Sequence, residues 1–383
     1  MRFAHLGDCH LGGWRQPELR QLNMDAFRSA IAEIIKEKLD FALVAGDLFD
    51  SAYPPIETIK ETFEEFRKLK DAKIPVFLIA GSHDYSATGK SFLDVLEKAG
   101  FVRNAFQPEE RNGLIMLHPI VYKNVAIYGY PGKKSGLEVP EIERIKLQDS
   151  PGLFRILMLH TAIRDAVKTL PIPAVNQENL PKVDYLALAH LHINYNKNNR
   201  VYSGPTFPNN SEELEELGGG SFYIVDTKGK IERREIRLKE TEVFNFTITN
   251  AVSATDEVID ELKKHSLQDK IVILRLSGSI EVGKTSDIKL NEIEDYVKKQ
   301  GAYSFLKSTS KLFITQSDMD IEIESGNLEE EIIKTFQEQN PHVLNGLALT
   351  LISALQVEKK EEETSRIFED RMASEVRKIL PLK

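Results

Sequence analysis

The feature that most constrains the fold is a series of short apolar runs in the first half of the chain. The runs are FAHLG, DFALVAG, IPVFLIAG, LFRILMLH and VDYLALAH, and helical patterns such as MDAFRSAIAEIIKEK separate the first three. Near-continuous apolar runs are typical of strands that are buried on both faces of a sheet. The alternation therefore predicts a layered α/β domain, in which ligands bind beyond the carboxyl ends of the strands.

Two of these runs lead into pairs of residues that can bind metal. Asp8 and His10 follow the first run, and His190 and His192 follow the fifth. In extended backbone, residues i and i+2 point to the same side of the chain, so each pair could reach one metal ion. Taken alone, a D-x-H pair is more often a chance occurrence or a cap than a metal-binding pair. For an H-x-H pair alone, the odds of metal binding are about even.

Two further runs end in single residues of the same kind. Asp47 follows a glycine at the end of the second run, where a carboxylate could bridge two cations, and His160 ends the fourth run. Taken alone, Asp47 would be a turn residue and His160 a core histidine. Because the strand ends of one sheet lie side by side, their conjunction predicts a two-metal site. Carboxylate and imidazole ligands suit Mn²⁺, Fe or Zn²⁺, and the share of oxygen ligands favours Mn²⁺.

The stretch GSHDYS follows the third run and has a different expected role. We expect His83 to face the substrate rather than the metals, and Asp84 could orient its ring. Ser82 is a poor metal ligand, because a hydroxyl is a weaker and shorter neutral oxygen donor than an amide carbonyl. It could bind an ion through water or with its own hydroxyl.

Composition limits the class of protein. The length of 383 residues suggests two or three domains, and the single cysteine, Cys9, allows no intrachain disulfide and fits a reducing compartment. The start of the chain has no apolar segment of signal-peptide length, and no run of 18 apolar residues exists, so we expect no membrane association and a cytoplasmic location. The net charge of −9 is weak evidence against DNA binding, although a local basic groove or bound cations could attract phosphates.

The remaining patterns predict three regions, 1–240, 241–316 and 317–383. The first closes with β-structure that includes a hairpin around KGK, and the second has a β-α-β-α-β pattern typical of a small α+β domain. The third is helical, and four apolar residues near its end fall on one face. These are Phe368, Met372, Val376 and Ile379. That face could pack on the chain's own body or dock a partner.

The ordered set GDCH, GDLFD, GSHD, LH and AHLH resembles the calcineurin-like metallophosphoesterases over roughly residues 1–235. The longer stretches FAHLGDCHLG, VAGDLFD, LMLH and YLALAHLHINY, and the later YSGPTF and GGSFYIVD, are similar to the archaeal form of the Mre/SbcD-type double-strand-break repair nuclease subunit. The resemblance implies a layered metallophosphoesterase β-sandwich flanked by helices. It adds a small α+β capping domain and C-terminal helices.

The resemblance also implies a ligand set for each of two metal ions. One ion would be held by Asp8, His10, Asp47 and His192. The other would be held by Asp47, Ser82, His160 and His190. The family motif at 81–84 is usually GNHD or GNHE, so Ser82 replaces an asparagine; Asp50 stands where many relatives carry His, and Ala189 where many carry Gly. We expect a functional dinuclear site whose second metal is held less tightly.

The activity that the resemblance implies is Mn²⁺-dependent 3′→5′ exonuclease and single-strand endonuclease action on DNA, in double-strand-break repair at the nucleoid. It also implies a homodimer and an SMC-like ABC ATPase partner bound by the C-terminal helices. Two alternatives stay open. One is a phosphodiesterase for a cyclic nucleotide or another nucleotide-type small molecule, which the acidic charge favours slightly. The other is a non-catalytic scaffold that binds DNA ends, with Ser82 marking a relaxed site.

Overall fold

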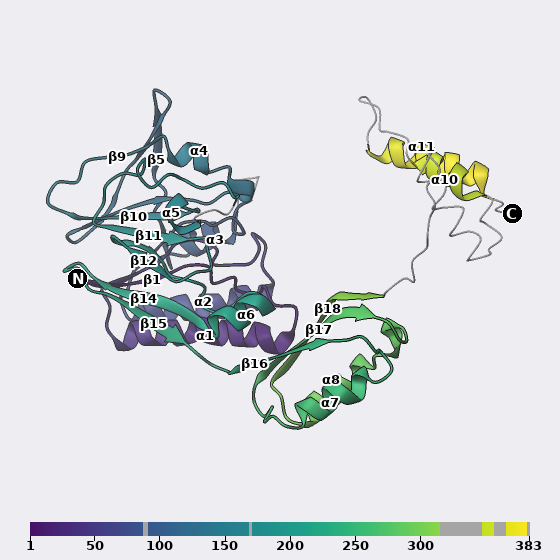
Figure 1. Cartoon of the computed structure of the whole chain (residues 1–383). Helices are drawn as coiled ribbons and strands as arrows, with labels where there is room; N and C mark the ends of the chain where they lie inside the picture. Colours follow the sequence, from purple (N-terminus) through teal and green to yellow (C-terminus); the bar gives the residue numbers. More distant parts are fainter. Residues whose placement is uncertain (87–90, 168–170, 315–346, 356–364, 381–383) are drawn as a thin grey trace. The chain divides into compact units, whose positions relative to one another are not determined.

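The structure is a computed structural model that describes residues 1–86, 91–167, 171–314, 347–355 and 365–380. The chain divides into two compact units, Met1–Thr315 and Gln316–Lys383 (Figure 1). In the described ranges, no helix is long and apolar enough to cross a membrane. The region boundaries expected at residues 240 and 316 stay predictions.

The first of two six-stranded sheets has the strand order β15-β14-β1-β2-β3-β4. Its strands are β1 (Arg2–Leu6), β2 (Phe41–Val44), β3 (Val76–Leu78), β4 (Arg103–Asn104), β14 (Gly220–Asp226) and β15 (Ile231–Ile236). Strands β1 to β4 pair in parallel, whereas β14 pairs antiparallel with both β1 and β15. The hairpin predicted around KGK is confirmed, because these residues connect β14 to β15.

The second six-stranded sheet has the order β12-β13-β11-β10-β8-β7. Its strands are β7 (Ile120–Tyr122), β8 (Val125–Tyr130), β10 (Phe154–His160), β11 (Tyr185–Ala189), β12 (Tyr195–Lys197) and β13 (Arg200–Tyr202). Its four central strands are parallel, and the edge strands β7 and β12 pair antiparallel. A separate three-stranded sheet contains β5 (Pro108–Arg111), β6 (Leu114–Leu117) and β9 (Ile145–Leu147).

Alternation along the strands produces the layers. In β1, Phe3 lies in a buried cluster that also contains Ile156 and Met158 of β10, so the two large sheets share a core. The neighbouring Ala4 and Leu6 belong to a different cluster, shared with the helices on the outer face of the first sheet. These helices are α1 (Pro17–Lys36), α2 (Ile56–Asp71) and α3 (Phe92–Lys98). The prediction of an α/β protein is confirmed, and the structure shows that it contains several sheets, the two largest of which are mixed.

Shorter helices complete this part of the chain. They are η1 (Lys134–Gly136), α4 (Val139–Ile142), α5 (Arg164–Val167) and α6 (Ser211–Leu217). Helix α6 begins at an N-cap asparagine, because the Asn210 side chain accepts hydrogen bonds from the backbone amides of Glu212 and Glu213, each at 2.9 Å. This cap fixes the first turn of α6, which carries Glu213.

The β-α-β-α-β pattern predicted after residue 240 is confirmed. It consists of β16 (Thr241–Thr247), α7 (Ala254–Leu262), β17 (Ile271–Ile280), η2 (Thr285–Asp287), α8 (Leu290–Lys299) and β18 (Ser304–Ile314). The three strands are parallel, and they share a buried cluster with both helices. This part contacts α1, because the hydroxyl groups of Tyr303 and Ser304 donate hydrogen bonds to the backbone and side chain of Glu18.

The second unit contains α10 (Ala348–Leu355) and α11 (Ser365–Ile379), which are in contact with each other. The apolar face predicted at the end of the chain is present on α11, since its four members are all half-buried: Phe368, Met372, Val376 and Ile379. Of the region 317–383 that we expected to be helical, residues 317–346, 356–364 and 381–383 lie outside the described ones.

Candidate metal centre

The structure brings five of the seven expected metal ligands together in two clusters. One contains Asp8, His10 and His192, and the other contains Asp8, Asp47 and His160; in each, the donor atoms lie within 4.8 Å of one another. These residues follow β1, β2 and β11 or, in the case of His160, end β10, and the carboxyl ends of these four strands meet at one edge of the shared core. Four of the five are fully buried, and His192 is partly exposed.

Asp47 belongs to the second cluster and also faces His10 of the first. Its Oδ2 is 3.1 Å from Nε2 of His160 and 3.7 Å from Nε2 of His10. A second pair of donors also faces inward, because Nε2 of His10 lies 3.1 Å from Nε2 of His192. Carboxylate and imidazole groups gathered in this way are a donor set for divalent transition metals, so the residues fit a dinuclear metal site.

Backbone strain accompanies this convergence. Asp8, His10, Asp47 and His190 have φ values of 50°, 44°, 48° and 99°, a region that non-glycine residues rarely adopt. The premise that the D-x-H and H-x-H pairs converge through extended backbone is therefore wrong. Tight loops aim the ligands instead, and the backbone amides of Asp8 and His10 donate to the carbonyls of Gly46 and Asp47. Strain of this kind costs about 1–3 kcal/mol per residue and gathers at functional sites.

A glycine is needed at position 46, where the loop after β2 passes His160. Its φ is 100°, and a Cβ atom at this position would lie 2.4 Å from Nδ1 of His160. That nitrogen is 3.1 Å from the carbonyl oxygen of Ala45, to which it can donate. The contact fixes the ring orientation and leaves Nε2 facing Asp47.

Glu213 is a site residue that sequence reasoning missed. Its Oε1 lies 2.9 Å from Nδ1 of His192, and its other oxygen accepts a hydrogen bond from the backbone amide of Asn209. A carboxylate behind a histidine fixes the tautomer and raises the basicity of the ligand. The spacing of Asn210 and Glu213 resembles a helix start with an acid in its first turn, but no sequence pattern links that turn to His192.

His190 and Ser82 lie beside the second cluster but outside it, among the described residues. The backbone amide of His190 donates to both carboxylate oxygens of Asp8, each at 3.0 Å, and its ring centroid is 5.1 Å from that of His160. The Ser82 hydroxyl is 3.3 Å from Oδ2 of Asp47. Their assignment as ligands of the second ion stays a prediction.

The structure gives Asp84 different contacts from those that we expected. Its two carboxylate oxygens accept hydrogen bonds from the backbone amides of Leu48, Phe49 and Gly81 at 3.0–3.1 Å. The ring of His83 is held by Asp50 instead, since its Nδ1 is 2.9 Å from the Asp50 carbonyl oxygen and 3.5 Å from Oδ1. Asp84 therefore ties two loops together and does not orient His83.

Asp50 has a second contact that links the two histidines. Its Oδ1 is 3.1 Å from Nδ1 of His10, and the rings of His10 and His83 are perpendicular with centroids 4.7 Å apart. The same three residues form a further group of potential ligands. The sequence marked Asp50 only as a position where many relatives carry His, and the structure shows that it contacts both His10 and His83.

The charges of the cluster shift its titration strongly. Burial lowers the pKa of His160, but the carboxylates of Asp47 and Asp8 outweigh it and raise this pKa to about 9. Burial opposes the charge of Asp47, yet the adjacent His160 and His10 hold its pKa well below the usual range. For His192, burial is outweighed by Glu213, and the pKa rises to about 9. A metal ion has to displace these protons when it binds.

Two neighbouring residues have pKa shifts opposite to those of the clustered histidines and Asp47. Burial and the positive charge of His160 lower the pKa of His190. Burial and the carboxylate of Asp47 raise the pKa of Asp84 to about 6, against the three amides that favour its charged form. Neighbouring groups with divergent pKa values are typical of functional sites.

Residues 1–194 match the model of the calcineurin-like phosphoesterases, and the chain belongs to this family. Within it, the chain is similar to archaeal proteins described as "DNA double-strand break repair protein Mre11". That of Methanosarcina mazei is 29% identical over 79% of this chain and 48% of its own length, and that of Archaeoglobus fulgidus is 25% identical over 97% of this chain and 90% of its own length. The chain thus spans about half the length of the Methanosarcina protein.

A solved structure titled "Structural and Functional Characterization of a Novel Archaeal Phosphodiesterase" aligns with 61% of this chain and 99% of its own, at 12% identity and a TM-score of 0.29. Together, the family and the clustered Asp and His side chains define a metallophosphoesterase related at modest identity to the archaeal Mre11 proteins.

Proposed function

We propose that this chain is a dinuclear-metal phosphodiesterase that acts on DNA, as a Mn²⁺-dependent 3′→5′ exonuclease and single-strand endonuclease in double-strand-break repair. The observation that carries the proposal is the convergence of buried Asp and His side chains at the strand ends. Similarity to a double-strand-break repair protein over 97% of the chain supports DNA as the substrate.

The residues would divide between two ions. Asp8, His10, Asp47 and His192 hold the first ion. Asp47, Ser82, His160 and His190 hold the second. Bound cations supply neutralisation of phosphate charge and activation of water for in-line attack. The chain itself orients the ligands. The strained loops direct their side chains, and hydrogen-bond partners of the second imidazole nitrogen fix the rings of the histidines.

His83 is the proposed catalytic residue outside the metal ligands. Its side chain is 46% exposed, at the rim of a pocket, and the Asp50 carbonyl and carboxylate hold its Nδ1. The Nε2 side can then stabilise charge on the phosphate or donate a proton to the leaving oxygen, a role typically worth 10²–10⁴-fold. Asp84 supports this loop through its three amide contacts and has the role of a positioning residue.

The rest of the chain would serve assembly. We propose that residues 241–316 form a capping domain over the nuclease domain at 1–240. In the region 317–383, the half-buried face of α11 would dock on an SMC-like ABC ATPase. Homodimerisation through the nuclease domain completes the proposed complex.

The test is cleavage of end-labelled double- and single-stranded DNA with Mn²⁺, Mg²⁺ or a chelator, with Asp47→Asn as the inactive control. Mn²⁺-dependent shortening from the 3′ end supports the proposal. Hydrolysis of a generic phosphodiester dye without DNA cleavage would assign the chain to small-molecule substrates. DNA binding without cleavage of any substrate would show that the chain is a non-catalytic scaffold that binds DNA ends.

A further inference from the structure

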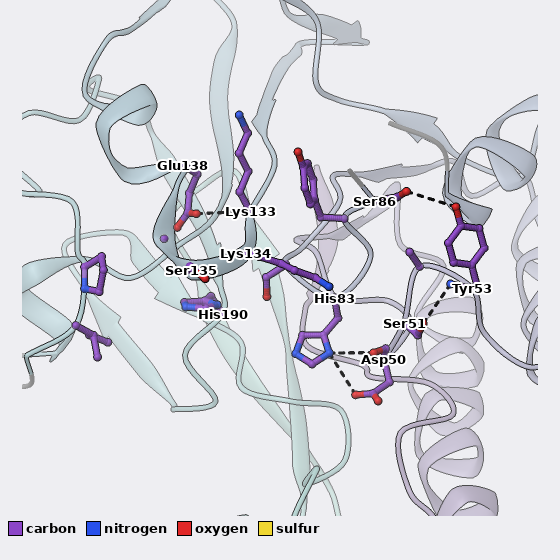
Figure 2. Close-up of a pocket in the computed structure, with 16 residues that line it drawn as sticks. Asp50, Ser51, Tyr53, His83, Ser86, Lys133, Lys134, Ser135, Glu138 and His190 are labelled. Atoms are coloured by element: carbon purple, nitrogen blue, oxygen red, sulfur yellow. Dashed lines mark hydrogen bonds and ion pairs between the residues drawn. The ribbon is translucent and has the colours of Figure 1, made fainter. Parts of the chain in front are cut away.

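A pocket of about 710 Å³ opens beside the metal centre, and its lining includes Ser82, His83 and His190. Figure 2 shows the two histidines among the residues that line it. A substrate whose phosphate reaches the ligands must place an adjoining group in this space. The volume lies in the range of ordinary ligand pockets, which take groups of nucleotide size or larger. The chemistry of its walls therefore bears on what lies next to the scissile phosphate.

One wall carries an exposed aromatic ring. Tyr53, in the loop between β2 and α2, is 64% exposed although it lines the pocket. Its hydroxyl lies 3.4 Å from that of Ser86, and its backbone amide donates to Ser51. The hydroxyl end of the side chain is thus held, while most of the residue is exposed to solvent. A flat aromatic face beside a phosphodiesterase site suits stacking with a base.

The opposite wall carries a cation. Figure 2 shows the Lys134 side chain extending from η1 toward His83. Among the described residues, its ammonium has no hydrogen-bond or ion-pair partner, whereas the neighbouring Lys133 is paired with Glu141. An ammonium without a carboxylate beside a metallophosphoesterase centre suits a backbone phosphate.

The turn that carries Lys134 is held in place. Gly136 has a φ of 71°, and a Cβ atom there would lie 2.7 Å from Cβ of Pro173, which also lines the pocket. The backbone amide of Lys133 donates to the buried Glu138, whose other oxygen accepts from Thr161 next to His160. This chain of contacts connects the lysine wall to the metal-ligand strand β10.

We propose that this pocket binds one unpaired nucleotide that adjoins the scissile phosphate, with its base stacked on Tyr53 and its backbone phosphate facing Lys134. The inference rests on the proposed phosphodiesterase function and deepens it. A base inside a duplex is covered on both faces by its neighbours, so it must leave the stack before it can cover Tyr53. The pocket therefore favours single-stranded or frayed ends over intact duplex.

The test measures coupling between a side chain and a substrate group. A fluorescent single-stranded oligonucleotide is bound in chelator and followed by anisotropy, with the base removed at each of the last four positions in turn. We expect one position at which loss of the base weakens wild-type binding about tenfold. Tyr53→Ala should abolish this dependence, and Tyr53→Phe, which keeps the ring, should retain it.

The same scan with methylphosphonate linkages tests Lys134. One linkage should weaken binding by wild type and leave Lys134→Ala unaffected. Lys228→Ala, which removes an exposed cation in the β14–β15 turn, is the charge-matched control and should behave as wild type. If no position depends on Tyr53 or Lys134, the pocket assignment is wrong.

Cleavage with Mn²⁺ separates this inference from the proposed nuclease function. Coupled binding without DNA cleavage would refute the nuclease and keep the nucleotide pocket. Cleavage that is equal in wild type, Tyr53→Ala and Lys134→Ala, with no coupling in either scan, would keep the nuclease and refute the pocket.

Discussion

Ser82 donates a hydrogen bond to Asp47: its Oγ lies 3.3 Å from the same Oδ2 that is 3.1 Å from Nε2 of His160. The serine therefore stands at the second cluster, but its short side chain contacts a carboxylate at that site. An asparagine at this position carries a longer side chain and a stronger neutral oxygen donor.

We predict that Ser82→Asn raises the affinity for the second metal ion about tenfold, because a carbonyl oxygen is added to its proposed ligands. Isothermal titration of the metal-free protein with Mn²⁺ measures the two sites. Ser82→Ala, which removes only the hydroxyl, should not raise the affinity. Equal second-site affinity in Ser82→Asn and wild type would contradict the assignment of position 82.

His83→Ala should lower the cleavage rate by about 10²–10⁴-fold and leave two metal equivalents bound. The reason is that its ring faces the pocket and is held by Asp50. Metal content by atomic emission, measured beside the rate, separates this role from that of His160→Ala, which should lose metal. A missing metal equivalent in His83→Ala would make His83 a ligand.

Glu213→Gln should weaken metal binding about 10–100-fold, because the carboxylate behind His192 raises the basicity of that ligand. It should also lower the pKa of His192 in the metal-free protein, which NMR titration of the ring measures. Glu216→Gln, an exposed acid on the same helix, is the matched control. An unchanged metal affinity would show that Glu213 has only a capping role.

Asp84→Ala should destabilise the fold by about 3 kcal/mol or more, since three backbone amides lose a charged acceptor, two of them after β2 and one after β3. Urea unfolding measures the free-energy change. Asp84→Asn keeps one carbonyl acceptor and should lose less. A large loss of activity at wild-type stability would restore the role of orienting His83.

His5 predicts a pH dependence of stability. Burial, opposed only in part by a backbone contact at Leu188, lowers its pKa to about 3, and its Nδ1 lies 2.9 Å from the Tyr185 hydroxyl. As the pH falls below about 6.5, His5 takes up a proton in the unfolded chain but not in the folded chain. The free energy of unfolding is therefore unaffected by protonation of His5 above pH 6.5, and it falls by about 1.4 kcal/mol per pH unit between pH 6.5 and 3.

The check is the free energy of unfolding of wild type and His5→Gln at pH 4.5, 5.5 and 7.5. The variant cannot titrate at this position, so the difference between the two proteins should shrink as the pH falls. A difference that stays constant over this range would show that His5 takes up its proton without unfolding.

Local sequence patterns were enough to predict much of the fold and most of the candidate metal ligands. The buried strands were evident from apolar runs, because a strand covered on both faces admits few polar residues. Asp8, His10, Asp47 and His160 were evident because they end or follow those runs. The expectation that strands of one sheet bring them together was wrong, because β1 and β2 lie in one six-stranded sheet and β10 lies in the other, and the two sheets share a core. The β-α-β-α-β part after residue 240 was evident from the same periodicity.

Only the tertiary structure decided which side chains contact and orient the histidines of the site. Glu213 lies 21 residues from His192, and Asp50 lies 33 residues from His83, so no local pattern could pair them. Asp84 is adjacent to His83 in sequence, yet its carboxylate satisfies amides after β2. Its direction is set by buried donors that need an acceptor, and these donors appear only when the strands are packed. Likewise, Tyr53 and Lys134 come to line one pocket only when distant loops are folded together.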